Sequence, residues 1–254
     1  MSGAGPIISL RGVRKGFGAQ EVLRGVDLDI RRGESLVVIG PSGCGKSVLL
    51  KHVIGLMRPD EGSIRVNGDE ITTMKSDSLY EVRKKFGMLF QGAALFDSLT
   101  VGENVALGLV EHTKLSKAEI GERVLERLRM VGMEHAAAKR PSELSGGMKK
   151  RVGLARAIAM DPEIILYDEP TTGLDPIMSD VINRLIRSLQ RELNATSITV
   201  THDMTSASKV ADRVAMLHEG RIVFEGSVEE VRSTPDPVVQ QFVHGSAEGP
   251  IQVL

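Results

Sequence analysis

Apolar positions along the chain follow two different periods. Short runs with strand character lie at residues 7–10, 22–30, 35–39, 63–66, 86–90, 164–169 and 197–200. Helical spacing appears at residues 46–57, 101–109, 117–130, from 148 onward and at 178–193. Residues 213–226 predict a hairpin that turns at Glu219-Gly220, and Ser227 is placed to cap a short helix. Strands that alternate with helices predict an α/β fold.

The apolar run at 35–39 leads directly into Gly40-Pro41-Ser42-Gly43-Cys44-Gly45-Lys46-Ser47, which opens the next helix. Its glycines let the backbone wrap closely around phosphate oxygens, and the helix start adds N–H donors and partial positive charge. Lys46 would reach the β and γ phosphates, and the Ser47 hydroxyl would ligate Mg²⁺. The segment therefore predicts a phosphate-binding loop rather than a glycine-rich connection alone.

A second apolar strand ends in two acids, Asp168 and Glu169. A buried parallel strand delivers such carboxylates to its C-terminal edge, where ligands bind. Asp168 would hold Mg²⁺, and Glu169 would act as the general base that polarises the attacking water. The alternative, an acid pair at a helix start, is less compatible with a phosphate loop elsewhere in the chain.

Three residues are ambiguous on local evidence. Residues 14–18 predict a glycine-flanked loop between two strands, and Phe17 in it is either a ring that stacks on a purine or a buried loop anchor. Gln91 follows an apolar strand and either binds Mg²⁺ and positions water or is an ordinary surface amide. His202 ends the strand near 200, where it either senses the γ phosphate or has a structural role.

The sequence Leu144-Ser145-Gly146-Gly147-Met148 immediately precedes a helix. Its position predicts a second anion site by the same backbone argument, and a simple helix cap explains it equally well. Lys149, Lys150 and Arg151 fall largely off the apolar stripe of this helix, so we expect them to form a solvated face.

Composition narrows the class of protein. The chain has 254 residues and a net charge of −1, which gives no electrostatic reason to expect nucleic acid as a partner. No apolar stretch approaches the ~20 residues that span a bilayer, and the start of the sequence lacks the pattern of a secretory signal. A single cysteine, Cys44, fits a reducing compartment. We expect a protein on the cytosolic side.

Taken in order, these motifs resemble the ATP-binding cassette (ABC) ATPases of membrane transporters over about residues 7–232. The resemblance rests on Phe17, the Gly40–Ser47 loop, Gln91, Leu144-Ser145-Gly146-Gly147, Asp168-Glu169, Gly173-Leu174-Asp175 and His202. It implies ATP hydrolysis coupled to transmembrane transport. The implied fold is a P-loop NTPase core with an antiparallel β subdomain and an inserted α-helical subdomain.

The resemblance also implies a division of the chain and a set of roles. The core would comprise residues 7–90 and 144–232, the helical subdomain residues 91–143, and a C-terminal tail residues 233–254. Glu169, His202 and Lys46 would be catalytic, and Ser47, Gln91 and Asp168 would hold Mg²⁺. The residues that bind ATP would be Phe17, Gly40, Pro41, Ser42, Gly43, Cys44, Gly45, Lys46, Ser47, Val48, Gln91, Ser145, Gly146, Gly147 and Asp175.

In this family the Ser-Gly-Gly segment of one subunit closes on ATP held by another, which implies a homodimer with Asp175 bridging the subunits. Gln91 would couple the site to the membrane domain. Two residues depart from the family pattern. Met148 replaces the usual glutamine and leaves the backbone site intact, while Val48 stands where a hydroxyl residue is common. Neither change removes a catalytic group, so we expect activity to survive.

Within the family the chain most resembles the MlaF-type ATPases of Mla/Mce phospholipid transport systems, on residues 90–97, 100–105, 145–148 and 168–176. This subgroup implies a peripheral protein at the cytoplasmic face of a bacterial inner membrane. Its partners would be an MlaE-like permease, a periplasmic MCE-domain subunit and, as a further candidate, a STAS-domain protein. Phospholipid would move between the inner and outer membranes.

Other members of the same fold remain alternatives. A transporter ATPase for another cargo, such as an amino-acid importer or a lipoprotein exporter, has the same motifs because cargo is chosen by other subunits. A DNA-associated ABC ATPase would carry a long coiled-coil insertion between the two halves of the core, and this sequence contains none. The sequence therefore disfavours a DNA-associated ATPase. The identity of the cargo rests on the resemblance alone.

Overall fold

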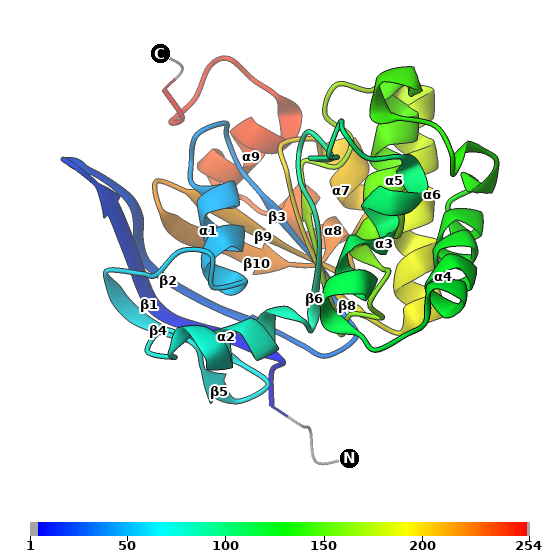
Figure 1. Cartoon of the computed structure of the whole chain (residues 1–254). Helices are drawn as coiled ribbons and strands as arrows, with labels where there is room; N and C mark the ends of the chain where they lie inside the picture. The colour runs from blue at the N-terminus through cyan, green and yellow to red at the C-terminus, as the bar shows by residue number, and fades with distance from the viewer. Residues whose placement is uncertain (1–4, 253–254) are drawn as a thin grey trace. The chain divides into compact units, whose positions relative to one another are not determined.

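The computed structural model describes residues 5–252, which form two compact units (Figure 1). The first unit contains the described residues up to Leu79 and those from Ile198 onward, and the second is Tyr80–Ser197. Helix α2, Ser76–Arg83, crosses the boundary in the sequence. No helix in the described range is both long and apolar enough to span a membrane.

The first unit contains an antiparallel sheet with strand order β2-β1-β4-β5. Its strands are β1 (Ile8–Phe17), β2 (Gln20–Ile30), β4 (Glu61–Val66) and β5 (Asp69–Glu70). Ile8 pairs with Ile30 on one side and with Val66 on the other, and all three side chains are buried. The sequence prediction of a loop at 14–18 was wrong, because β1 continues to Phe17, which pairs with Gln20.

A second group of strands in this unit lies in the order β10-β9-β3-β8. These are β3 (Ser35–Ile39), β8 (Thr196–Thr201, whose first two residues fall in the second unit), β9 (Arg213–His218) and β10 (Arg221–Gly226). β3 is buried throughout and runs parallel to β9, and β9 and β10 form the predicted hairpin.

The helices of the first unit are α1 (Lys46–Val53), α7 (Met204–Val210), α8 (Val228–Ser233) and α9 (Pro237–His244). α1 is shorter than the predicted 46–57, because Gly55 after it adopts φ 70°, a left-handed conformation that ends the helix. Ser227 caps α8, as predicted, and its hydroxyl accepts a hydrogen bond from the Glu230 N–H at 3.1 Å.

The second unit combines two parallel strands with four helices. Strands β6 (Phe86–Leu89) and β7 (Ile164–Asp168) pair with each other, and the helices are α3 (Val101–His112), α4 (Lys117–Met130), α5 (Gly146–Ala157) and α6 (Pro176–Leu193). Short 3₁₀ turns occupy Glu134–Ala136 and Pro141–Glu143. Capping boxes at Thr100 and Ser116 start α3 and α4. The four-part division of the chain stays a prediction, and its last part extends two residues beyond the described range.

Candidate functional site

The predicted phosphate loop joins the C-terminal end of β3 to the start of α1 in the first unit. A Cβ added at Gly40, which has φ 152°, would lie 2.2 Å from the carbonyl oxygen of Leu217. At Gly45, with φ 105°, it would lie 2.9 Å from Cγ1 of Val22. Both positions therefore require glycine, because a side chain there would clash with the protein that surrounds the loop.

The N-terminus of α1 differs from those of the other helices whose caps are described. No side chain caps it, and its first turn holds no acidic residue, whereas side chains cap α3 through α9. Lys46 is 6% exposed, and its ammonium donates to the carbonyls of Gly40 at 2.7 Å and Pro41 at 2.9 Å. A buried cation folded over an uncapped helix start fits a phosphate group.

Two further predicted residues lie in the same unit. Phe17 is 46% exposed, so the alternative of a buried loop anchor was wrong, and the ammonium of Lys15 lies 5.7 Å from the centroid of its ring. An exposed ring at the end of a strand offers a face to a base. His202 is exposed and directly follows β8, the neighbour of β3, while Asp203 caps α7.

The predicted acids lie in the second unit. Asp168 ends β7 and is 7% exposed, Glu169 follows it and is 9% exposed, and α6 begins only at Pro176. The alternative of an acid pair at a helix start was therefore wrong. Glu169 has φ 48°, a left-handed conformation that a side chain strains, and its Oε2 accepts a hydrogen bond from the Thr172 hydroxyl at 3.0 Å. Such strain is typical of functional positions.

The Ser-Gly-Gly segment begins α5, and Ser145 is its N-cap. The Ser145 hydroxyl accepts a hydrogen bond from the Met148 N–H at 3.3 Å, and the first turn holds no acid. The segment is thus a helix cap, and it stays a predicted anion site. Asp175 caps α6 by accepting hydrogen bonds from the N–H groups of Ile177 and Met178 at 2.9 and 3.0 Å.

One functional candidate was missed from the sequence. Lys150, expected on a solvated face, is only 5% exposed, and its ammonium donates to the carbonyls of Gln91 and of Glu169, the latter at 3.1 Å. Burial lowers the pKa of Lys150, while the charges of Asp168 and Glu169 act in the opposite direction. A helical projection shows only that Lys150 lies off the apolar stripe, so no sequence signal identified these partners.

A family model described as "ABC transporter" matches residues 23–172, more than half of the chain. The chain belongs to the ABC transporter family. It is accordingly an ABC ATPase that binds and hydrolyses ATP. The fold and family predicted from the sequence are confirmed. The structure therefore places the phosphate loop, Phe17 and His202 of this ABC ATPase in one unit and Gln91, Asp168, Glu169 and Ser145 in the other.

Relatives and solved structures agree with this assignment. The chain is 44% identical over 247 residues to the probable ribonucleotide transport ATP-binding protein mkl of Mycobacterium leprae, covering 97% of this chain and 71% of that protein. It is 42% identical to the intermembrane phospholipid transport system ATP-binding protein MlaF of Haemophilus influenzae, covering 92% and 89%. A dimeric post-hydrolysis structure of the ATP-binding cassette MJ0796 with ADP and Pi matches with a TM-score of 0.80 at 35% identity, covering 87% and 98%.

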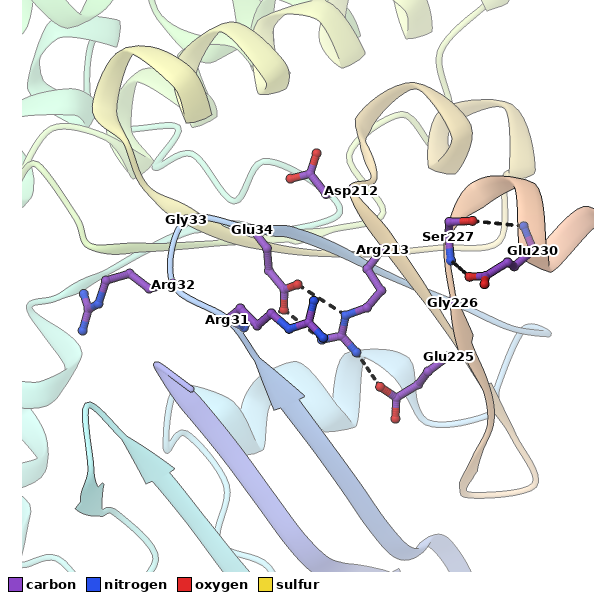
Figure 2. A pocket seen from close by; sticks show the side chains of 10 residues that line it. All are labelled: Arg31, Arg32, Gly33, Glu34, Asp212, Arg213, Glu225, Gly226, Ser227 and Glu230. Carbon is purple, nitrogen blue, oxygen red and sulfur yellow. Dashed lines mark hydrogen bonds and ion pairs between the residues drawn. The ribbon is translucent and has the colours of Figure 1, made fainter. Parts of the chain in front are cut away.

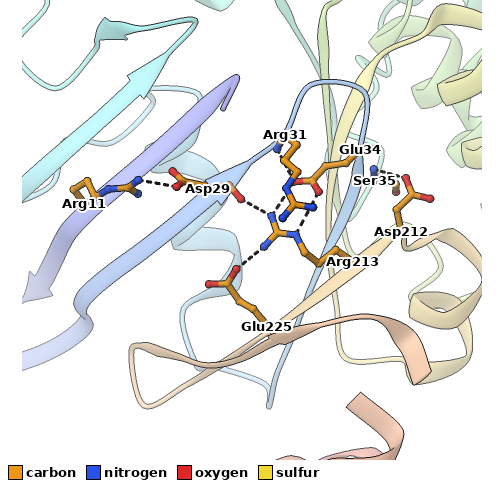
Figure 3. A network of polar contacts seen from close by, with 8 residues as sticks. All are labelled: Arg11, Asp29, Arg31, Glu34, Ser35, Asp212, Arg213 and Glu225. Atoms are coloured by element: carbon orange, nitrogen blue, oxygen red, sulfur yellow. Dashed lines mark hydrogen bonds and ion pairs between the residues drawn. The ribbon is translucent and has the colours of Figure 1, made fainter. Parts of the chain in front are cut away.

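Charged residues line a cavity of about 710 Å³ in the first unit of this ABC ATPase (Figure 2). Arg31 to Glu34 line it and precede β3, whereas the phosphate loop follows β3, so the two lie at opposite ends of that strand. Its charged side chains bind one another: Arg213 donates to Glu34 at 2.8 Å and to Glu225 (Figure 3). We interpret this cavity as the edge of a structural ion-pair network rather than as the nucleotide site.

Proposed function

We propose that this ABC ATPase drives phospholipid transport between the inner and outer membranes of a bacterium. The uncapped start of α1, with the buried Lys46 as its first residue, is the observation that supports ATP as the nucleotide that is hydrolysed. Phospholipid as the cargo rests on the MlaF relatives, which are named as ATP-binding proteins of an intermembrane phospholipid transport system. The mkl relatives carry the name of a ribonucleotide transporter, so ribonucleotide is the second candidate cargo.

Hydrolysis joins a water oxygen to the γ phosphorus and breaks the bond from that phosphorus to the β–γ bridging oxygen. We assign Glu169 as the base that accepts the proton of the water, because its carboxylate is nearly buried at the end of β7. Lys46 and the N–H groups at the start of α1 would stabilise the negative charge on the transferred phosphoryl group. His202 would contact the same γ phosphate, and Phe17 would stack on the adenine.

The residues predicted for Mg²⁺ suit that ion chemically. Ser47, Gln91 and Asp168 offer hydroxyl, amide and carboxylate oxygens, the donors that Mg²⁺ prefers alongside phosphate oxygens and water. When bound, Mg²⁺ would neutralise charge on the β and γ phosphates. Asp168 is 7% exposed at the end of a buried strand, where a carboxylate is stabilised by a cation.

We propose a homodimer in which Ser145, Gly146, Gly147 and Asp175 of one subunit complete the nucleotide site of the other. The dimeric MJ0796 structure supports this assembly. The proposed partners are an MlaE-like permease and an MCE-domain subunit, with a STAS-domain protein as a further candidate. The protein would then lie at the cytoplasmic face of the inner membrane.

Glu169→Gln tests the assigned base. It keeps the shape of the side chain and removes its basicity, so we expect ATP turnover to fall by about 100-fold or more while ATP binding persists. Glu122→Gln, at an exposed position of α4, is the matched control and should leave turnover unchanged. Full turnover by the Glu169→Gln protein would refute the assignment.

Purification from membranes through a tag on this chain tests the cargo. Mass spectrometry would identify the subunits and lipids that remain bound. A multispanning permease with an MCE-domain subunit and phospholipid would support the proposal. A permease with a solute-binding protein and bound nucleotide would support the ribonucleotide alternative and overturn phospholipid as cargo.

A further inference from the structure

Two cationic side chains of helix α5 bind main-chain carbonyls of residues 91–94, which follow β6. Besides the Lys150 bond to the Gln91 carbonyl, Arg156 donates to the carbonyls of Ala93 at 2.6 Å and Ala94 at 2.7 Å. Both alanines adopt left-handed backbone conformations, with φ 61° and 47°. Because side chains strain this conformation, the segment needs external support, and α5 supplies donors to three of its carbonyl oxygens.

Lys150 also binds the main chain of Glu169, the predicted base. The carbonyl of Glu169 accepts from the Lys150 ammonium at 3.1 Å and from the Thr172 N–H at 3.3 Å. The backbone of Glu169 also adopts a left-handed conformation, with φ 48°. One ammonium group therefore binds the main chain of both Gln91 and Glu169, two residues that lie 78 positions apart in the sequence.

We propose that Lys150 is a positioning residue for ATP hydrolysis, which fixes the main chain of Glu169 relative to that of Gln91. This inference rests on the proposed roles of those two residues. Lys150 itself touches neither substrate nor metal in this scheme. It acts through the Glu169 carbonyl, whose position sets the direction in which the Glu169 carboxylate leaves the main chain, and the Gln91 carbonyl is the second anchor of the Lys150 ammonium.

Lys150 is 5% exposed as a residue, so the two carbonyl bonds of its ammonium replace hydration and are costly to break. Removal of the ammonium leaves a strained turn at Glu169 with one donor fewer. A catalytic group displaced by about 1 Å loses about 100-fold in rate. The loss falls on the chemical step, because nucleotide affinity comes mainly from the phosphate loop.

Lys150→Met tests this role, because methionine has a similar length and no donor. In the tagged complex purified from membranes, we expect kcat for ATP to fall about 10- to 100-fold while KM changes less than about twofold. Lys149→Met lies on the same helix, and within the described residues Lys149 makes no bond to Gln91 or Glu169, so this control variant should retain wild-type kcat. Lys150→Arg keeps the charge and the donors and should recover most of the lost kcat.

The double variant Lys150→Met with Glu169→Gln separates positioning from a general structural defect. If Lys150 acts through Glu169, single-turnover hydrolysis by the double variant should be no slower than by Glu169→Gln alone. A further tenfold loss in the double variant would overturn the proposal, and so would wild-type kcat in Lys150→Met. If Glu169→Gln itself kept full turnover, the assigned base would be wrong and the positioning role would fall with it.

Discussion

Replacing Arg213 by methionine tests how far the first unit depends on one partly buried cation. The guanidinium donates to Glu34 at 2.8 and 3.3 Å, to Glu225 and to the main-chain carbonyl of Asp29 (Figure 3). The side chains of Arg213 and Glu34 are 15% and 10% exposed, and that of Glu225 is 39% exposed. Methionine keeps much of the apolar volume and removes every donor.

The expected loss of unfolding free energy depends on which hydrogen bonds each partner of Arg213 can replace. Glu225 can return to water, so its pair contributes at most about 1 kcal/mol. Glu34 stays largely buried with the Arg31 N–H at 2.6 Å as a donor, and removal of one partner from a buried pair costs about 3–5 kcal/mol. We therefore expect the free energy of unfolding to fall by about 3–5 kcal/mol.

Urea unfolding followed by circular dichroism measures this loss. Arg221→Met, at an exposed position of the neighbouring strand β10, is the matched control and should stay within about 0.5 kcal/mol of the wild type. Adding Glu34→Gln to Arg213→Met should recover part of the stability, because it removes the buried charge. An Arg213→Met protein within about 1 kcal/mol of the wild type would refute the reasoning.

Three further predictions concern stability. Gly87→Ala should lower the free energy of unfolding by about 3 kcal/mol or more, because the added Cβ would lie 2.0 Å from the Ala157 carbonyl oxygen. Gly121→Ala is the control: its Cβ would meet open space, so urea unfolding should show an unchanged or higher stability. Tyr167→Phe should raise the midpoint of thermal unfolding by the equivalent of about 1 kcal/mol, because the buried Tyr167 hydroxyl has no hydrogen-bond partner within the described residues; a lower midpoint would contradict this. Burial, aided by the charge of Lys15, lowers the pKa of His52 below its usual value, so the unfolded chain binds the proton more readily and stability falls as the pH drops below about 6.5. His52→Leu should lose less stability than the wild type between pH 7 and pH 5, and equal losses would exclude His52 as the cause.

Much of the fold was predictable because its signals are local. The phosphate loop shows itself in one stretch, since glycine spacing, a preceding apolar strand and a following helix are all neighbours in sequence. The strand that ends in Asp168 and the helix over 178–193 were predictable for the same reason, because buried strands and amphipathic helices carry their own periodicity. The ends of helices and strands were predicted less accurately: α1 ends at Val53, and β1 continues through Phe17.

The sequence by itself determined the residue types at the nucleotide site, and with them the family. Only the tertiary structure decided which side chains are buried and what they bind. Lys150 has the sequence character of a surface lysine, and Arg213 begins an ordinary strand, yet each binds partners from distant parts of its own unit. Periodicity reports the preferred face of an element. It cannot report which distant carbonyl or carboxylate lies opposite that face, because this depends on how the chain brings separated segments together.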